Sequence, residues 1–505
     1  MAITDARSID PSTDPEESVT QASSRAGAKP WLVPRRGVLA VASLLLAGCT
    51  VGPKYVRPAT DVPSDYKEAS SEFKQAEPRD QIAKGKWWEI YDDPRLNSLE
   101  ERISVSNQTL KAQQAQFVEA RAALRIARAQ LYPAVSASLS ASRTGQSQNR
   151  ALFSNPARQV YNDFALPFDV SYEPDVWGRV RRSVEASHAQ AQASAADLAS
   201  VDLSLHAELA TDYFELRGLD SEKQLLDSTV EAYQRALQLT QSRYQGGVAS
   251  AVDVAQAQTQ LETTRALAKD VEVNRARFEH AIAVLTGETP ATFSIQPMSL
   301  TTPPPPTPPG LPSDLLERRP DIAGAERRVE LASAQIGVAR AAYFPLFTIT
   351  GVGGFESSAL GTLIQGPSGL WALGGSAAQL IFDGGQRRGV SEQARAAFDQ
   401  SVASYRQTVL TGFLEVEDNL AALRILQDEA QTQAGAVAAA EHSLELSNNR
   451  YRGGVANYLE VTTAQSAALS DEVTAVNLLT RRMTSSVLLI KALGGGWSVS
   501  QIPPI

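Results

Sequence analysis

The side chains that could perform catalysis or bind a metal are few and widely spaced in this sequence. It contains one cysteine, Cys49, and four histidines, which lie far apart at His188, His206, His280 and His442. No pair of histidines has the spacing of a zinc site, and a single cysteine forms neither a disulfide framework nor a cysteine-based metal site. The glycine-rich phosphate-binding motifs and the GxSxG motif of hydrolases are also missing from the sequence. We therefore expect no enzyme activity, no cofactor and no metal site.

Cys49 is nevertheless placed for one covalent modification. Arg35 and Arg36 precede an apolar run of about a dozen residues, the pattern of a signal peptide rather than of a membrane-spanning helix. The run ends in Leu-Ala-Gly-Cys at residues 46–49, which resembles a bacterial lipobox, in which the cysteine is lipidated and becomes the first residue of the mature protein. We predict a lipoprotein-type signal peptide over residues 1–48 and a covalent lipid on Cys49. The alternative is a buried structural cysteine that follows a chance apolar run.

Composition excludes several other classes of protein. The 505 residues are 43% hydrophobic and 20% charged, which is typical of a folded chain. The net charge of −9 lacks the basic excess of a nucleic-acid-binding protein, so we expect no nucleic-acid partner. Beyond residue 50, no window of the sequence reaches the ~20 apolar residues that a membrane-spanning helix needs.

One unit occurs twice along the chain. Residues 239–249 (LTQSRYQGGVA) recur as 446–456 (LSNNRYRGGVA), and residues 126–133 recur as 338–345. A Pro-rich linker at 301–313 separates the copies. We therefore predict a duplicated domain, with a first repeat at 94–300 and a second at 314–496. A segment at 49–93 would precede the repeats and carry the lipid, and a tail at 497–505 would follow them.

The two repeats have the same predicted order of elements. A first helix, at 94–131 or 314–343, ends at a proline. Apolar side chains then alternate with small or polar ones, which predicts two strands per repeat. A long helix ending at Gly-Gly and a shorter helix complete each repeat. The strands are predicted at 134–145, 162–176, 346–356 and 370–382, and the helices at 181–244, 250–286, 387–451 and 456–492.

The length of the helices and the number of strands constrain the architecture. Some 60 helical residues extend about 95 Å, which suits a protein that crosses a wide gap. Four strands are too few to close a membrane barrel, and an open sheet in lipid would leave unsatisfied backbone groups at its edges. Either the sheet is half-buried in a soluble protein, or several chains share one barrel. The predicted lipid favours the second arrangement, in which three chains supply twelve strands.

Several motifs resemble those of the TolC-like outer-membrane efflux proteins, in particular the NodT/OprM-like lipoproteins that serve resistance-nodulation-division pumps. The motifs are LLERRPDIAGAERR at 315–328, AQIGVARAAYFP at 334–345, WW at 87–88 with DPRL at 93–96, SYE at 171–173 with WGR at 177–179, FDGG at 382–385 and ALGGGW at 492–497. The resemblance implies a mixed α and β fold. In it, three chains form a twelve-stranded outer-membrane β-barrel that is continuous with a periplasmic tunnel of coiled α-helices. The segment at 49–93 would contact the middle of that tunnel.

The same resemblance implies a location, partners and a function. The protein would lie in the outer membrane of a Gram-negative bacterium. Thr50, the residue after the lipidated cysteine, resembles the residues found there in lipoproteins that are sorted to the outer membrane. Its partners would be two further copies of the chain, outer-membrane lipid, a periplasmic adaptor and an inner-membrane pump. Together they would move drugs or other small solutes outward through the tunnel. The alternatives are the channel of a type I secretion or metal-cation efflux system, and a structural coiled-coil lipoprotein of the envelope.

The resemblance also assigns candidate sites. The two Arg-Tyr-x-Gly-Gly segments would lie at the periplasmic end of the tunnel, which opens like an iris, and a carboxylate would hold an Arg or Tyr there. The alternative is that these are surface residues of a last helical turn. The gate candidates are Arg243, Tyr244, Asp253, Arg450, Tyr451 and Glu460. The adaptor-contact tips are Gly246, Gly247, Val248, Gly453, Gly454 and Val455. The lipid-facing candidates are Phe164, Phe168, Tyr172 and Trp371.

Overall fold

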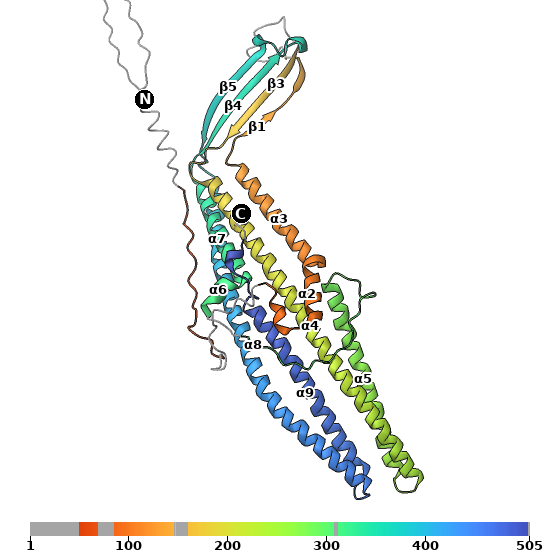
Figure 1. The fold of residues 1–505 in the computed structure, drawn as a ribbon. Helices are drawn as coiled ribbons and strands as arrows, with labels where there is room; N and C mark the ends of the chain where they lie inside the picture. The colour runs from red at the N-terminus through yellow and green to blue at the C-terminus, as the bar shows by residue number, and fades with distance from the viewer. Residues whose placement is uncertain (1–49, 69–84, 146, 148–159, 308–311, 503–505) are drawn as a thin grey trace, which may run out of the picture. The chain divides into compact units, whose positions relative to one another are not determined.

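Two copies of one arrangement follow each other along the chain (Figure 1). The computed structural model describes residues 50–68, 85–145, 147, 160–307 and 312–502, so Cys49 and the predicted signal peptide lie outside the described residues. The first copy comprises the 3-10 helix η2 (Trp87–Tyr91) and α2 (Pro94–Ser106), α3 (Gln108–Ala129), β1 (Ala134–Ala137), β2 (Ser140–Gly145), β3 (Val160–Tyr172), α4 (Arg179–Gln245) and α5 (Ala251–Leu285). The second comprises α6 (Leu315–Arg318), α7 (Pro320–Ala341), β4 (Leu346–Ser357), β5 (Gly369–Ala378), α8 (Gln386–Arg452) and α9 (Tyr458–Ala492).

The long helices of the two copies match in length but not in burial. α4 and α8 have 67 residues each, and α5 and α9 have 35 each. α4 buries 21 of its residues, whereas α8 buries nine. Large apolar side chains of α8, including Leu410, Leu414 and Ile425, are more than half exposed. α8 therefore presents an apolar surface that no other described part of this chain covers.

The first helix of each copy is broken, unlike the predicted continuous helices. In the first copy, Asn107 adopts an extended backbone, and its side chain accepts a hydrogen bond from the Leu110 N–H at the start of α3. Its amide also donates to the carbonyl oxygen of Leu285. In the second copy, Arg319 is extended because Pro320 follows it, and a proline disfavours the helical conformation at the preceding residue.

The strands also differ from their predicted bounds. The predicted strand at 134–145 is two strands, β1 and β2, and the strands predicted to reach residues 176 and 382 end at Tyr172 and Ala378. Carboxylates explain the early ends, because they cap the helices that follow. Asp175 accepts hydrogen bonds from the N–H groups of residues 180 and 181, and Asp383 accepts from those of residues 385 and 387.

The strands form one antiparallel sheet with two chemically different faces. β1 and β2 both pair with β3, on the edge opposite β4, so the sheet is four strands wide in the order β1/β2–β3–β4–β5. Side chains alternate between the faces of a strand. The register gives one face, which we call the apolar sheet face, to Phe164, Phe168, Tyr172, Ile349, Phe355, Trp371 and Leu373. The opposite face carries Asp163, Asp169, Ser171, Thr350 and Glu356.

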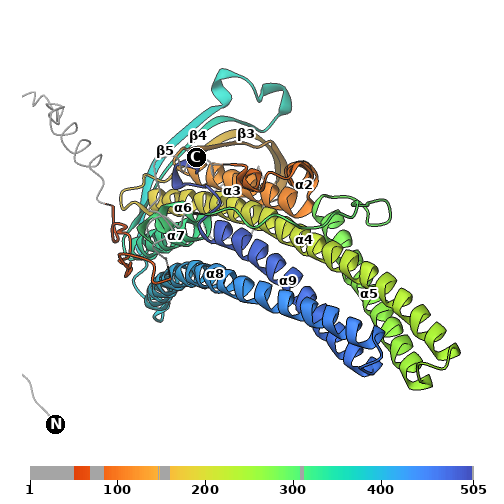
Figure 2. The ribbon, with the colours of Figure 1, turned by 60° about the horizontal axis from the view of Figure 1, so that its bottom comes forward.

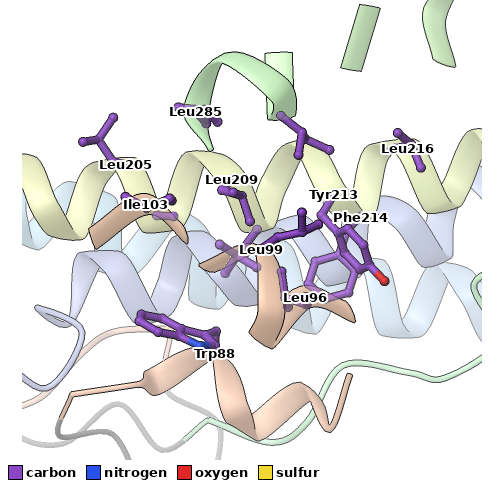
Figure 3. Close-up of a cluster of buried hydrophobic side chains, with 14 of the residues drawn as sticks. Trp88, Leu96, Leu99, Ile103, Leu205, Leu209, Tyr213, Phe214, Leu216 and Leu285 are labelled. Carbon is purple, nitrogen blue, oxygen red and sulfur yellow. The ribbon is translucent and has the colours of Figure 1, made fainter. Parts of the chain in front are cut away.

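A hydrophobic cluster fastens the N-terminal elements to the middle of α4 (Figure 3). Trp87 and Trp88 of η2 are 2% and 6% exposed. Each fully buried large side chain stabilises the fold by roughly 1.5–3 kcal/mol, so this cluster makes η2 and α2 part of the helical body. We call it the belt cluster, and its members include Trp87, Trp88, Leu96, Leu99, Ile103, Leu205, Leu209, Tyr213 and Phe214.

Close contact between α4 and α9 depends on Gly218. A Cβ atom at this position would lie 2.1 Å from the Thr480 hydroxyl oxygen. Gly218→Ala should therefore destabilise the fold by about 1–3 kcal/mol through overpacking. Gly435→Ala, in α8 with nothing within 4 Å of the added methyl, should instead stabilise it by about 0.5–1 kcal/mol.

Thermal unfolding followed by circular dichroism would measure both changes. Adding Thr480→Ala to Gly218→Ala removes the overlapping hydroxyl and should restore most of the loss. Equal effects of the two single glycine substitutions would contradict this account of the crossing.

Candidate functional site

Four helices form a row with a cavity on its concave side. α3 packs on α4, α4 on α7 and α7 on α8 (Figures 1 and 2). A cavity of about 820 Å³ takes lining residues from all four helices. Because α3 and α8 are the outer members of the row, a cavity that touches both lies on its concave side. The lining is mostly small or neutral, with Ala120, Ala123, Ser183, Ser187, Gln190, Gln335, Val338, Gln393 and Ala397.

Three carboxylates, Glu208, Asp212 and Glu215, lie along α4 on the side that faces the concave cavity, and we call them the acidic stripe. Glu208 follows Gln190 by 18 residues, which is about five helical turns, so the two side chains leave α4 in the same direction. Asp212 and Glu215 follow at helical spacing on the same face. Within the described parts of the chain, none of the three carboxylates has an ion-pair partner. Burial, reinforced by the charges of Glu208 and Glu215, raises the pKa of Asp212 to about 7. The stripe is thus a row of negative charge that changes near neutral pH.

A buried ion pair lies in the belt cluster. The Nδ1 atom of His206 is 2.6 Å from a carboxylate oxygen of Glu100, and the residues are 3% and 0% exposed. The Trp88 ring stacks on the imidazole with centroids 4.3 Å apart. Burial alone would lower the pKa of His206, but hydrogen bonds and charges from Asp202 and Glu100 outweigh it and raise this pKa to about 9. Burial raises the pKa of Glu100 to about 7.

The two predicted tips have the same backbone geometry. Gly247 and Gly454 both adopt the left-handed conformation at φ 75°. In each tip the valine N–H, Val248 or Val455, donates to the carbonyl oxygen of the arginine five residues earlier. This is the Schellman motif, which satisfies the last carbonyls of a helix and requires a residue that tolerates positive φ. The two valine side chains are 69% and 71% exposed, while Gly246 and Gly453 cap the long helices.

Arg243 joins the two tips. Its Nη1 donates to the carbonyl oxygen of Arg452 at 3.1 Å, and its guanidinium carbon lies 4.8 Å from the centre of the Tyr451 ring. Tyr451 is 5% exposed and packs edge-on against Tyr458, with centroids 5.1 Å apart. Ala257 of α5 belongs to the same cluster. One cation therefore links the α4–α5 hairpin to the α8–α9 hairpin.

The other gate candidates make contacts within a single hairpin. Arg450 Nε lies 3.3 Å from a carboxylate oxygen of Glu460, which connects the end of α8 to the start of α9. Asp253 forms a capping box with Ser250 at the start of α5, so it is a helix-capping residue rather than a partner of Arg243. Tyr244 is 51% exposed. Of the six candidates, Arg243 and Tyr451 meet across the tips.

The four lipid-facing candidates share the apolar sheet face. Phe168 is 46% exposed and Trp371 83% exposed, while Phe164 and Tyr172 are half-buried. A face of this kind, with exposed aromatic side chains, needs an apolar environment or another protein surface to cover it. The sequence pattern predicted that these residues lie on strands. The pairing register shows in addition that strands from both halves of the chain contribute side chains to one surface.

Two kinds of feature are absent from the residues that the structure describes. No helix there is both long and apolar enough to cross a membrane. Nor does any group of three or more His, Cys, Asp or Glu side chains in that part of the chain have the arrangement of a metal site. The Arg243–Arg452 contact was not predicted from the sequence, because its acceptor is a backbone carbonyl that any residue type supplies.

Comparisons with known proteins agree on one family. A profile of the outer membrane efflux protein family matches residues 100–288 and 311–495. TtgC, the outer membrane protein of a toluene efflux pump in Pseudomonas putida, is 32% identical over 461 residues, which cover 91% of this chain and 95% of TtgC. The outer-membrane channel OprN matches with a TM-score of 0.83 at 30% identity, over 89% of this chain and all of that one. The CmeC outer membrane channel of Campylobacter jejuni matches with a TM-score of 0.83 at 26% identity, over 90% of this chain and 96% of CmeC.

Proposed function

Because the chain belongs to the outer membrane efflux protein family, we propose that it is the outer-membrane channel of a tripartite efflux pump. In this role it conducts drugs or other small organic solutes outward by diffusion, while a periplasmic adaptor connects it to an inner-membrane pump of the resistance-nodulation-division type. The toluene pump served by TtgC supports small organic solutes as the cargo.

The observation that carries the proposal is the concave row of α3, α4, α7 and α8. One chain supplies only an arc, whose cavity is open, and α8 leaves an apolar surface uncovered. Three arcs related by symmetry would close into a tunnel and bury that surface. The sheet also supports an assembly of three chains, since three sheets that are each four strands wide would form a twelve-stranded barrel without edges.

The tips are the proposed periplasmic gate. Arg243 and Tyr451 hold the two hairpins of one chain together, and Arg450 with Glu460 stiffens the second hairpin. The exposed turns that end in Val248 and Val455 are the proposed adaptor contacts.

The apolar sheet face is the proposed lipid contact, with the lipid on Cys49 as a second anchor. Phe168→Arg should place a charge in lipid and cost up to about 2–4 kcal/mol, whereas Asp169→Arg on the opposite face should cost little. The yield of heat-resistant trimer in outer-membrane fractions measures both. Equal yields of the two variants would mean that the apolar face does not contact lipid.

The acidic stripe should make the channel prefer cations. Asp212 ionises as the pH rises through about 7, so cation preference should increase between pH 6 and pH 8. Asp212→Asn should flatten that pH dependence. Reversal potentials across a planar bilayer with a salt gradient provide the measurement, and an unchanged pH dependence in the variant would contradict this placement of Asp212.

Two experiments test the function itself. The purified trimer should give single-channel currents in a planar bilayer, and deletion of its gene should make cells more susceptible to drugs or solvents. A folded protein that gives no current would instead favour a structural envelope lipoprotein. Loss of secretion of a protein substrate, with unchanged susceptibility, would favour a type I secretion channel.

A further inference from the structure

An apolar cavity lies where the helices meet the sheet, next to the concave cavity, with which it shares Arg179 and Ala342. Three segments line it: residues 173–177 and 179 between β3 and the start of α4, residues 341, 342 and 344–347 between the end of α7 and the start of β4, and residues 378–380 at the end of β5. Its volume of about 480 Å³ falls in the range of roughly 300–1,000 Å³ that is typical of ligand sites. We call it the junction cavity.

The walls of the junction cavity favour an apolar ligand. Trp177 stacks on Phe344 with centroids 4.7 Å apart, and the indole N–H already donates to the carbonyl oxygen of Pro345 at 2.9 Å. The charges at the rim are also paired, because Arg179 makes two hydrogen bonds to Glu173, at 3.0 and 2.6 Å. The cavity therefore offers ring faces and aliphatic side chains rather than an unpaired charge.

The N-terminal segment contacts one of the segments that line this cavity. The Val51 N–H donates to the carbonyl oxygen of Trp177 at 3.1 Å. Thr50 packs against Gly178, where a Cβ atom would lie 2.8 Å from the threonine methyl group. Cys49 immediately precedes Thr50, and consecutive Cα atoms are about 3.8 Å apart. A group attached to Cys49 therefore begins within one residue of the segment that lines the cavity.

The segment approaches from the outer side of the helical row. Gly52 contacts Gly337 so closely that a Cβ atom on Gly52 would lie 2.6 Å from the Gly337 Cα. Gly337 is six residues from Leu331, which lines the concave cavity, so the two point roughly 120° apart around α7. Phe347 of the junction cavity belongs to the apolar sheet face, because it is two residues before Ile349, whereas Leu346 and Ala378 belong to the opposite face. The cavity thus lies at the end of the sheet, next to the apolar sheet face and beside the loop that the N-terminal segment contacts.

We propose that the junction cavity holds one of the acyl chains attached to Cys49 of the same chain, an inference that rests on the lipid anchor proposed above. The remaining acyl chains stay in the membrane. The seated chain packs between Trp177, Phe344 and Leu380 and fixes the helix–sheet junction at a set position relative to the membrane surface.

Photocrosslinking from the acyl chain tests this. Cells would be fed a fatty acid that carries a diazirine, and the purified trimer would be irradiated, digested and analysed by mass spectrometry. The expected product is the Cys49 peptide joined through its acyl chain to a peptide containing Trp177 or Phe344. Ala378→Trp should fill the cavity and lose this product. Ala372→Trp, on the same face of β5 but outside the cavity, should keep it.

Each outcome decides a separate point. A Cys49 peptide without any acyl group would overturn the lipid anchor and this inference together. An acylated Cys49 whose photoproducts lie only on phospholipid, or only on residues outside the junction cavity, would overturn the acyl seat and leave the anchor intact. Phospholipid adducts on the Trp177 and Phe344 peptides would identify a free lipid as the occupant and also overturn it. The product from the unsubstituted trimer decides the question if Ala378→Trp fails to fold.

Discussion

Arg243→Gln should leave the protein folded and inserted but raise its conductance and make cells sensitive to a large antibiotic such as vancomycin. The substitution removes the charged donor to the Arg452 carbonyl and the cation over the Tyr451 ring. A hydrogen bond from a charged group contributes roughly 1.5–3 kcal/mol, and a trimer would contain three copies. Three bonds of about 2 kcal/mol sum to about 6 kcal/mol, which is enough to move a two-state gate from mostly closed to mostly open.

Arg450→Gln is the matched control for this prediction. It removes an ion pair of the same tip that lies within a single hairpin and does not join the two hairpins, so it should change conductance little. Arg243→Lys keeps the charge without the planar guanidinium and should give an intermediate current. Single-channel recordings of the three variants would separate these cases. If Arg243→Gln and the unsubstituted protein conduct equally, the hairpins are held together elsewhere along α5 and α9.

His206→Phe should destabilise the protein by about 3–5 kcal/mol per chain at pH 8, because it leaves the Glu100 carboxylate buried without a charged partner. Phenylalanine retains a ring for stacking on Trp88, so the loss measures the missing charge rather than missing volume. His280→Phe, at an exposed position of α5, is the control and should have little effect. Thermal unfolding in detergent compares them.

The same pair should make stability fall as the pH rises. The folded-state pKa of His206 is about 9, above its ordinary value of 6.5, so its stabilising contribution is complete below pH 6.5 and is lost as the pH rises through 9. The raised pKa of Glu100, about 7, acts in the same direction from pH 4.5 upward. A pKa shift of this size for His206 corresponds to a change in the free energy of unfolding on the order of 3 kcal/mol.

Unfolding temperatures at pH 6 and pH 9 measure that dependence. Glu100→Gln combined with His206→Phe removes both titrating groups and should largely abolish the difference between the two pH values. A difference as large in the double variant as in the unsubstituted protein would assign it to other groups.

The features that could be predicted from the sequence are those that depend on residues close together along the chain. The repeated Arg-Tyr-x-Gly-Gly segments predicted two similar tips, because a Schellman turn needs a glycine at one fixed position after the helix. The spacing of Arg450 and Glu460 across that turn also brings them together, as the ion pair at 3.3 Å shows. Alternation placed Phe168 and Trp371 on strands, and the side-chain period of two then puts them on one face once the register is known.

Features that depend on other parts of the fold could not be predicted in the same way. The break at Asn107 lies inside a helical pattern. The carbonyl oxygen of Leu285, which accepts a hydrogen bond from the Asn107 side-chain amide, is 178 residues away in the sequence. Gly218 is an ordinary helix-weakening residue in the sequence, and only the position of Thr480 on α9 shows that no side chain fits there. Which side of α4 faces the concave cavity likewise follows from its neighbours and not from its own sequence.

The unequal burial of α4 and α8 has a consequence for the order in which the molecule forms. α4 meets its partners α3, α5, α7 and α9 within one chain, so it can fold as soon as that chain is complete. α8 is equally long and packs on α7 and α9 of the same chain, but it buries fewer than half as many residues, and its exposed leucines are not covered by any described part of the chain. A newly made chain would therefore pass through an intermediate in which α4 is covered on all its contact faces and α8, although packed on α7 and α9, still has one apolar face exposed. The rate at which α8 becomes protected should rise with protein concentration, while that of α4 should not.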